Sequence, residues 1–378
     1  MAKLRNRRGV TLVLMAFMLT VLIGSAAFTI DFGRMFMYRS QLQVAADASA
    51  LAGAHRILKK DPCTATDSAI AYAGRHKVGA DTARLAAGDV ILGSWTSAGG
   101  FVPSTASPAC GDPGLDAVKT TPRDTATYGL GRIFGLSTRP LSASAIAVMG
   151  YVGFTTCVRP VAIPYQSLLN QLYPTGHDPV TGDTITVDYN LTPADVDSLR
   201  AAGVSKAVSL KLGSDATQGN FYIVNLGPYS HSDQVPLSPA PNFGGNNVFA
   251  DRFGGNCANS PWSIGPGDWL EGKTGDADGP TRAGYGELCG VSITGNGTFG
   301  CPISEEAASI KVAMWATEND GVCTPRCFQV KIVGVFVVTG FTKSPSGDDG
   351  IIGYFSAIAS SGTLSATPTP IQKIALVK

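Results

Sequence analysis

The sequence predicts an α+β protein, in which an N-terminal transmembrane helix extends into the exported space and is followed by a mainly antiparallel, β-rich exported region. Three observations predict this class. Residues 9–30 carry no charge, helical spacing of apolar and small residues continues to residue 60, and the later apolar runs are short, rich in Val and Ile, and separated by Gly and Pro. We expect three parts: a membrane anchor and extended helix at 1–60, a membrane-proximal α+β region at 61–150, and a β-rich exported domain with Gly-rich loops at 151–378.

The run at residues 9–30 is the first of these elements, and its 22 positions hold no charged side chain. About 20 apolar residues span the hydrocarbon core of a bilayer, so the run predicts a single-pass membrane anchor. Basic residues precede it without an acid among them, which by the positive-inside rule holds the N-terminus in the cytoplasm and exports everything after Asp31. These basic residues are Lys3, Arg5, Arg7 and Arg8. The residues assigned to the anchor are Gly9, Leu12, Leu14, Phe17, Leu19, Leu22, Ile23, Phe28 and Ile30.

A cleavable secretory signal is the alternative for this segment. The triplet Ser25-Ala26-Ala27 has the small residues of a cleavage site after a basic and apolar start. Against cleavage, the apolar run continues through Phe28 and Ile30 and passes without Gly-Pro punctuation into a second helical pattern.

That second pattern covers residues 31–60 and contains two ladders of small residues four positions apart. Such a face lets another helix approach closely, which is a packing device of membrane proteins. The alternative is an Ala-rich helix that reflects only the high helix propensity of Ala. On the first interpretation, the residues that pack on a partner helix are Leu42, Ala46, Asp47, Ala50, Gly53 and Ala54. Together, positions 10–60 predict one helix of about 75 Å.

Shorter elements follow the long helix. Residues 61–80 predict a short helix that begins near Pro62 and is broken by Gly74 and Gly79, and residues 93–125 predict hairpin loops. Beyond residue 151 we expect the strands of a sandwich or barrel, one helix at 193–202 capped by Thr192, and irregular loop at 240–300 with Trp262 and Trp269. The expected strands lie at 184–189, 207–212, 221–226, 330–341, 351–359 and 371–377.

The amino-acid composition excludes several classes of function. Of 378 residues, 44% are apolar, 15% are charged, 45 are Gly and 23 are Pro, which describes a folded chain rather than a disordered one. A net charge of +1 leaves no global basic field, so we expect no nucleic-acid partner. Only five acids are Glu, the first at Glu271, which excludes glutamate-based catalysis before that point.

All eight cysteines lie after the anchor, where an even number in an oxidising compartment favours disulfides. Eight cysteines permit 105 connectivities. We predict the pairs Cys63 with Cys110 and Cys323 with Cys327. The more specific alternative is a zinc site, but no Cys-x-x-Cys knuckle is present to support it. Its ligands would be Cys289, Cys301, Cys323 and Cys327.

Two short sequence strings resemble ligand-binding loops but lack the flanking residues and key positions that such loops require. Residues 267–274 match the P-loop pattern Gly-x-x-x-x-Gly-Lys-Thr, yet prolines precede them and Asp268 and Glu271 would repel phosphate. Asp276, Asp278 and Glu287 have the spacing of a calcium loop whose sixth position, normally Gly, is Thr281. A solvated acidic loop is the favoured interpretation. We expect no cofactor, no metal and no nucleotide.

Catalytic patterns are also missing from the sequence. It has no Gly-x-Ser-x-Gly elbow, and the four histidines stand apart from one another without a His-x-x-x-His pair. We therefore expect a protein that is not an enzyme.

The N-terminal strings carry a resemblance. Arg7-Arg8-Gly9 before the apolar run, Asp31-Phe32-Gly33-Arg34 after it, and the Gln- and Ala-rich stretch 41–54 resemble the N-terminal module of TadG-like proteins of the tight-adherence (Flp) pilus system. The strings at 89–95, 116–119, 131–135 and 141–145 are similar to the strands that follow in this family. The resemblance implies a component of a pilus assembly or secretion apparatus, located in the bacterial inner membrane with its bulk in the periplasm.

Two departures limit what the resemblance implies. Pilins of this pathway carry Glu five residues after the processing Gly, where this sequence has Leu14, and the Asp-x-Ser-x-Ser string of a von Willebrand A domain is absent. We therefore expect an anchoring component that contacts the membrane and pilus-assembly proteins of the same apparatus. The alternative is a membrane-tethered, exported ligand-binding or hydrolytic domain unrelated to pili, with a site among the 240–300 loops.

Overall fold

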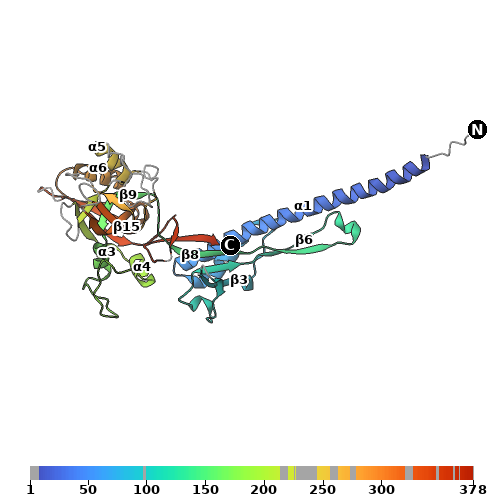
Figure 1. The fold of residues 1–378 in the computed structure, drawn as a ribbon, viewed down its shortest axis with the longest axis horizontal. Helices are drawn as coiled ribbons and strands as arrows, with labels where there is room; N and C mark the ends of the chain where they lie inside the picture. The colour runs from blue at the N-terminus through green and yellow to red at the C-terminus, as the bar shows by residue number, and fades with distance from the viewer. Residues whose placement is uncertain are drawn as a thin grey trace, which may run out of the picture. The chain divides into compact units, whose positions relative to one another are not determined.

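The chain forms two compact units, of which unit 1 comprises Met1–Met149 with Ile374–Lys378 and unit 2 comprises Gly150–Lys373. The computed structural model describes residues 8–96, 99–212, 220–224, 226, 245–255, 263–272, 278–319, 327–345, 349–360, 362–365 and 367–377. The chain passes from one unit to the other within strand β8 (Ala145–Val152) and within strand β19 (Ile371–Val377). Figure 1 shows both units.

Unit 1 begins with a single helix, α1 (Arg8–Leu58), of 51 residues (Figure 1). Its length of about 75 Å is the predicted one, and no proline interrupts it. The helix ends where Lys60 adopts a left-handed φ of 59° and the amide of Asp61 donates to the carbonyl oxygen of Arg56. Pro62 then starts a new turn, because a proline is tolerated at the first helical position.

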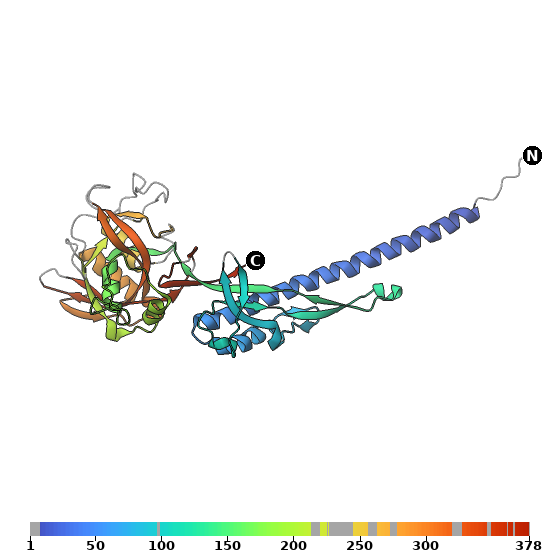
Figure 2. The same ribbon diagram turned by 60° about the horizontal axis from the view of Figure 1, so that its bottom comes forward.

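The C-terminal half of α1 packs in unit 1 on a second helix and a sheet (Figure 2). The short turn η1 (Pro62–Thr64) leads into α2 (Ala65–Ala73), as the sequence predicts. The sheet runs in the order β19-β8-β5-β3-β4, and the pairings of β3 with β4 and β5 and of β5 with β8 are antiparallel. Its remaining strands are β3 (Val90–Thr96), β4 (Gly100–Pro103) and β5 (Ala117–Thr120).

A separate hairpin of unit 1 runs alongside α1 toward the N-terminal half of the helix in both ribbon views (Figures 1 and 2). It consists of β6 (Arg123–Thr127) and β7 (Thr138–Ser142), joined by a tip that contains the turn η4 (Gly131–Phe134). The tip closes with a left-handed residue, Gly135, at φ 80°. The smaller elements of the unit are β1 (Lys77–Val78), β2 (Asp81–Thr82), η2 (Ala87–Asp89) and η3 (Ala109–Gly111).

Unit 2 is built on strands that close into a barrel. The order β15-β14-β9-β11-β10-β16 returns to its start because β16 also pairs with β15. Alternate residues serve two cores: Val312 and Met314 of β14 lie in one buried cluster, and Ala313 and Trp315 lie in another. The ring strands are β9 (Val158–Pro164), β10 (Val208–Leu212), β11 (Asn220–Ile223), β14 (Ser309–Asn319), β15 (Cys327–Lys343) and β16 (Gly350–Ser356).

Helices and short strands surround this ring. Helix α4 (Pro193–Arg200) begins with a capping box, in which Thr192 and Asp195 each accept from the other's backbone N–H, and this confirms the predicted cap. The remaining elements of unit 2 are α3 (Tyr165–Leu172), η5 (Val204–Lys206), α5 (Gly245–Gly254), β12 (Trp269–Glu271), α6 (Asp278–Cys289), β13 (Gly297–Gly300), α7 (Glu305–Ala308), β17 (Ile358–Ala359) and β18 (Leu364–Ser365).

The α+β class is confirmed, and three local predictions are wrong. The described residues between 240 and 300 form two helices and two strands rather than continuous loop, because Phe253 of α5 and Tyr285 of α6 are buried in the barrel core. Residues 184–189 form no strand. Strands β9 and β14 were not predicted, because β9 throughout and β14 at residues 312–315 are buried on both faces and lack the alternation that reveals a strand.

Candidate functional site: the N-terminal helix and the hairpin beside it

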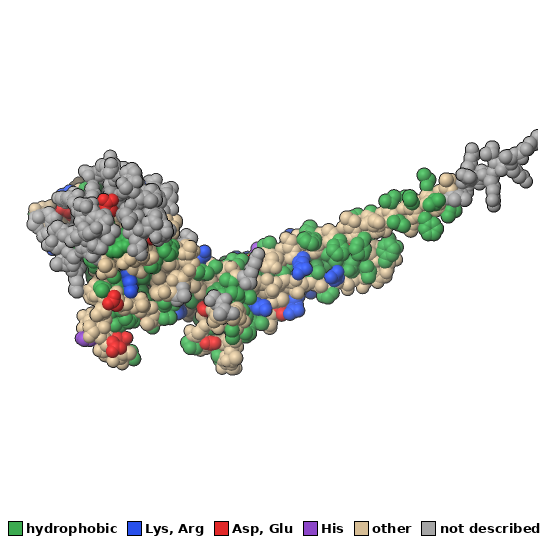
Figure 3. All heavy atoms as spheres, in the orientation of Figure 1, with side chains coloured by type: hydrophobic (Ala, Val, Ile, Leu, Met, Phe, Trp, Pro, Cys, Tyr) green, Lys and Arg blue, Asp and Glu red, His purple; other side chains and the backbone are tan. Residues whose placement is uncertain are grey.

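The first half of α1 exposes large apolar side chains to its surroundings. Leu12 and Phe17 are each more than 70% exposed, and hydrophobic side chains cover this end of the helix in Figure 3. We call residues 11–30 the exposed segment. The other anchor residues with measured exposure are Leu14, Leu19, Leu22, Ile23, Phe28 and Ile30, all of which are more than half exposed. Gly9 lies in the first turn of the helix.

The polar side chains of the exposed segment are satisfied by the helix itself. Thr20, Ser25 and Thr29 each donate a hydroxyl hydrogen bond of 2.7–2.8 Å to the carbonyl oxygen four residues earlier. A hydroxyl bonded in this way does not present an unpaired donor to hydrocarbon. By length and composition the helix is therefore compatible with a single-pass membrane anchor near the N-terminus. Of the flanking basic residues, Lys3, Arg5 and Arg7 lie outside the described residues.

The second half of α1 is buried in unit 1. We call residues 42–58 the packed segment. Leu42, Ala46, Ala50 and Ala54 have no exposed surface and share one core cluster with strands of the sheet. A Cβ built on Gly53 would lie 2.9 Å from Cγ1 of Val118 on β5. The helix and the strand therefore approach more closely here than any larger residue allows.

Helix α2 supplies a matching small face. Its residues Ala65, Ala69 and Ala73 are fully buried in the same cluster as the Ala ladder of α1. The hydroxyl of Ser49 donates to Thr120 Oγ1 at 2.9 Å, so the polar side chains within this contact are also paired. The face that the sequence assigns to a partner helix is thus covered by helix and strand of the same chain. Only Asp47 is half-exposed there, and it accepts from Gln43 Nε2 at 2.8 Å.

Asp31 joins the hairpin tip to α1 between the two segments. Its carboxylate accepts from the backbone N–H of Gly129 at 2.8 Å, of Leu130 at 3.3 Å and of Gly131 at 2.5 Å. The side chain is 5% exposed. Hydrogen bonds to an ionised acceptor are stronger than neutral ones, so this one residue fixes the tip on the helix. Sequence reasoning missed the contact, and its only signal was an acid directly after the charge-free run.

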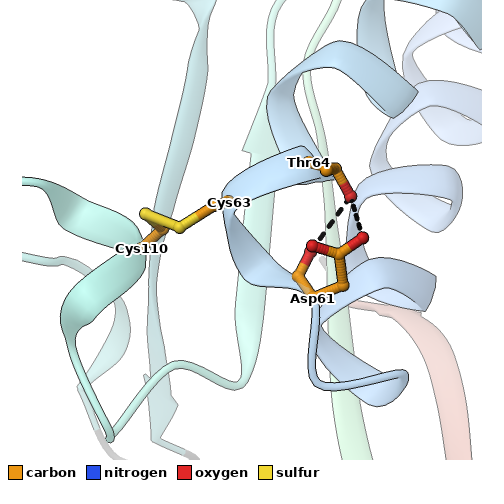
Figure 4. The surroundings of a disulfide bond; sticks show 4 residues. All are labelled: Asp61, Cys63, Thr64 and Cys110. Atoms are coloured by element: carbon orange, nitrogen blue, oxygen red, sulfur yellow. Dashed lines mark hydrogen bonds between the residues drawn. A yellow bond between two sulfur atoms is a disulfide. The ribbon is translucent and has the colours of Figure 1, made fainter.

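Disulfides stabilise both units. Cys63 and Cys110 are bonded, as predicted, with Cα atoms 5.0 Å apart, and this bond ties η1 to η3 (Figure 4). Beside it, the hydroxyl of Thr64 donates to the carboxylate of Asp61. A second bond joins Cys289 and Cys301, and it removes both thiolates from the alternative zinc site.

The other cysteine prediction is only partly covered by the structure. Cys327 is disulfide-bonded, whereas Cys323, its predicted partner, lies outside the described residues. Among the residues that the structure describes, no group of three or more His, Cys, Asp or Glu side chains is arranged to hold a metal ion.

The two strings that resemble a P-loop and a calcium loop have other structural roles. Within residues 267–274, Trp269–Glu271 form strand β12 and pair with β15, and Trp269 is 8% exposed. A strand bound into a sheet does not wrap around phosphate. Asp278 and Glu287 lie in one helix, α6, whereas a calcium loop needs its ligands to converge from a turn. Trp262, Lys273, Thr274 and Asp276 lie outside the described residues.

One buried cation of unit 2 has unusual chemistry. Lys311 Nζ donates to Thr155 Oγ1 at 2.9 Å and to Ser360 Oγ at 3.0 Å. Burial, and after it the positive charge of Arg159, lower the pKa of Lys311 to about 8. Arg159 itself is 8% exposed and donates to the carbonyl oxygens of Arg252 and Gly255 at the end of α5. Periodicity gave no sign of this lysine's contacts, because its partners Thr155 and Ser360 lie 156 and 49 positions away along the chain.

The geometry therefore defines a class of protein: an apolar N-terminal helix compatible with a membrane anchor, continued into the core of a following α+β unit. Comparison with known families gives a more specific assignment. Residues 9–56 match the family described as putative Flp pilus-assembly TadE/G-like, and residues 52–147 match the family described as putative Tad-like Flp pilus-assembly. The N-terminal part of this chain is thus that of a TadG-like Tad/Flp pilus-assembly protein, as the resemblance indicated. No curated protein and no solved structure matches the chain.

Proposed function

We propose that this protein is a non-enzymatic, membrane-anchored envelope component of a Tad/Flp-type pilus assembly or secretion apparatus. In this proposal the exposed segment of α1 crosses the bacterial inner membrane once, with the N-terminus in the cytoplasm. Units 1 and 2 stand in the periplasm, where they contact proteins of the same apparatus. Neither nucleic acid nor nucleotide takes part.

The division of α1 carries the proposal. A helix that exposes Leu and Phe over its first half has an apolar surface that water disfavours and lipid accepts. The same helix then enters the core of unit 1, so the anchor and unit 1 share one continuous helix. Such continuity suits a component that holds a periplasmic structure at a fixed distance from the membrane. The two family matches cover this part of the chain, and both families are described as Flp pilus-assembly families, which supports a role in that apparatus.

Gene deletion with counting of surface pili by electron microscopy tests this role. Complementation uses the intact protein and a variant in which residues 9–30 are replaced by an unrelated transmembrane helix. The replacement stops at residue 30 because Leu42 and the residues after it belong to the core of unit 1. We expect loss of pili, restored by both versions if the exported units make the contacts and by the intact protein alone if the exposed segment does. Normal piliation after deletion would overturn the proposal.

The orientation needs its own measurement. Alkaline phosphatase fused to the C-terminus folds only in the periplasm, because its disulfides form there. We expect an active fusion, and an inactive one would reverse the proposed topology.

A second candidate function rests on the contact between Lys311 and Ser360. Lys311 donates to the Ser360 hydroxyl at 3.0 Å and has a pKa of about 8, so once it has lost its proton the neutral amine can accept the serine's proton and activate it as a nucleophile. This favours the hydrolytic alternative for the exported domain. A fluorophosphonate probe distinguishes the two functions: labelling that is lost in Ser360→Ala and in Lys311→Met supports the hydrolase, and absence of labelling leaves the assembly role.

A further inference from the structure

We propose that the tip of the β6–β7 hairpin, residues 128–136, enters the same bilayer as α1, so that the protein contacts lipid through two elements. This inference rests on the proposed membrane anchor and adds a second, non-helical contact to it. The occupant of the surface is the acyl-chain region of the membrane.

Exposure of the tip is the first argument. Ile133 is 76% exposed and Phe134 65%, although both are large apolar residues at the end of a two-stranded hairpin. Leu130 and Leu136 are exposed beside them. Arg132 is the only charged side chain in the tip, and a long arginine side chain can reach phosphate headgroups while its stem stays in apolar surroundings. Four large apolar side chains are therefore exposed within residues 130–136.

The second argument is the depth of the tip in the bilayer, because the tip is fixed beside the charge-free run of α1. Asp31 binds its backbone just after that run ends. From there the tip extends back toward the N-terminus of α1, and a Cβ built on Gly24 would lie 3.8 Å from Cζ of Phe134. Gly24 precedes Asp31 by seven residues, or about 10 Å along the helix axis. If residues 9–30 span the bilayer, the ring of Phe134 therefore lies at the level of acyl chains.

A groove between the tip and the helix strengthens this placement. It has a volume of 360 Å³ and is lined mainly by apolar groups, among them Ala27 and Phe28 of α1 and Tyr128 and Leu136 of the hairpin. The groove is thus continuous with the exposed segment of the helix. Lipid chains that surround α1 at this depth also fill the groove.

Most backbone N–H groups of the tip are paired, as entry into hydrocarbon requires. Unpaired N–H groups are costly there, which restricts irregular structure in membranes. Three N–H groups of the tip donate to Asp31, and others donate to carbonyl oxygens within the hairpin at 3.0–3.2 Å. These donors are Tyr128, Ile133, Gly135 and Leu136.

The test measures lipid contact at single positions of the full-length protein in liposomes. A genetically encoded coumarin amino acid replaces Ile133, Leu19 or Val102, one position per variant. All three side chains are exposed, so the fold should tolerate the probe. The vesicles contain phosphatidylcholine with or without brominated acyl chains, which quench fluorescence by contact. Leu19 reports on the proposed anchor, and Val102, on β4, sets the baseline.

We expect strong quenching at Leu19 and quenching at Ile133 that exceeds the Val102 value about twofold or more. Quenching at Leu19 with Ile133 at the baseline would overturn the second contact and leave the anchor intact. Baseline values at both Leu19 and Ile133 would remove the anchor itself and this inference with it.

Discussion

The two halves of α1 have the same backbone and opposite surroundings. In the exposed segment the apolar residues are large, as at Leu12 and Phe17, and they project away from the protein. In the packed segment half of the buried positions are Ala, beside Ser49 and Gly53, whereas Leu42, Ile57 and Leu58 lie at its two ends. The packed segment also contains charged residues, Asp47 and Arg56, which the exposed segment lacks. Side-chain size separates the middle of the packed segment from the exposed segment, because close packing against a neighbouring backbone requires small residues whereas lipid imposes no such limit.

The largest expected effect comes from adding bulk to the packed segment. In Gly53→Leu the new Cβ would lie 2.9 Å from Cγ1 of Val118 and the rest of the side chain would have no space. Overpacking of this kind costs about 3 kcal/mol or more. Urea unfolding of the detergent-solubilised protein, followed by far-UV circular dichroism, measures the change. Gly33→Leu is the matched control, because nothing lies within 4 Å of a Cβ there. Equal stability of the two variants would contradict the comparison.

A charge placed in the exposed segment should affect membrane insertion rather than the fold. Leu19→Arg puts a cation near the middle of the charge-free run, at a cost of about 3 kcal/mol for insertion. We expect a smaller fraction of the protein to stay with the membrane after alkaline extraction. Val44→Arg makes a similar change at an exposed position of the packed segment and should leave insertion unchanged. If both variants insert normally, the exposed segment is not the anchor.

Removal of Asp31 should release the hairpin at the boundary between the segments. Asp31→Ala deletes a carboxylate that accepts hydrogen bonds from three backbone N–H groups. Hydrogen exchange at Gly129–Gly131 should accelerate by about tenfold or more, because local opening becomes easier. Asp47→Ala removes an acid whose described contact is one side-chain amide and should leave exchange in the tip unchanged. Unaltered protection in Asp31→Ala would show that apolar contacts alone hold the tip.

The smallest effect concerns a charge buried in unit 2. The pKa of Lys311 falls on folding from an ordinary value of 10.5 to about 8. Between these values the unfolded chain binds a proton that the folded chain has released, so the free energy of unfolding should rise with pH in this window. Below pH 8 both states hold the proton and the group adds no slope. Urea midpoints at pH 7.5 and 9.5 should therefore differ less in Lys311→Met than in the parent protein. Identical pH dependence in both would contradict the lowered pKa.

The sequence was sufficient for elements whose pattern is local. The 51-residue helix and the cap at Thr192 were both predicted. The disulfide between Cys63 and Cys110 was also predicted, although it joins residues 47 positions apart. The same reasoning failed at residues 240–300, where abundant Gly suggested loop but burial of Phe253 and Tyr285 favours helices. Tertiary packing overrides propensity when a segment contributes to a core. The small-residue face of α1 packs on α2 and β5 of the same chain, and its packing on a partner helix stays a prediction.

The sequence by itself determined the long apolar helix, its exposed run and the β-rich character of the exported region. Each depends on periodicity and composition within a few turns or strands. Only the tertiary structure decided what covers the Ala ladder, how β15 and β16 close the barrel, and that the hairpin tip binds Asp31. That last contact joins residues 98 to 100 positions apart. No local pattern encodes a partner at such a distance, because the pairing arises only when the whole unit folds.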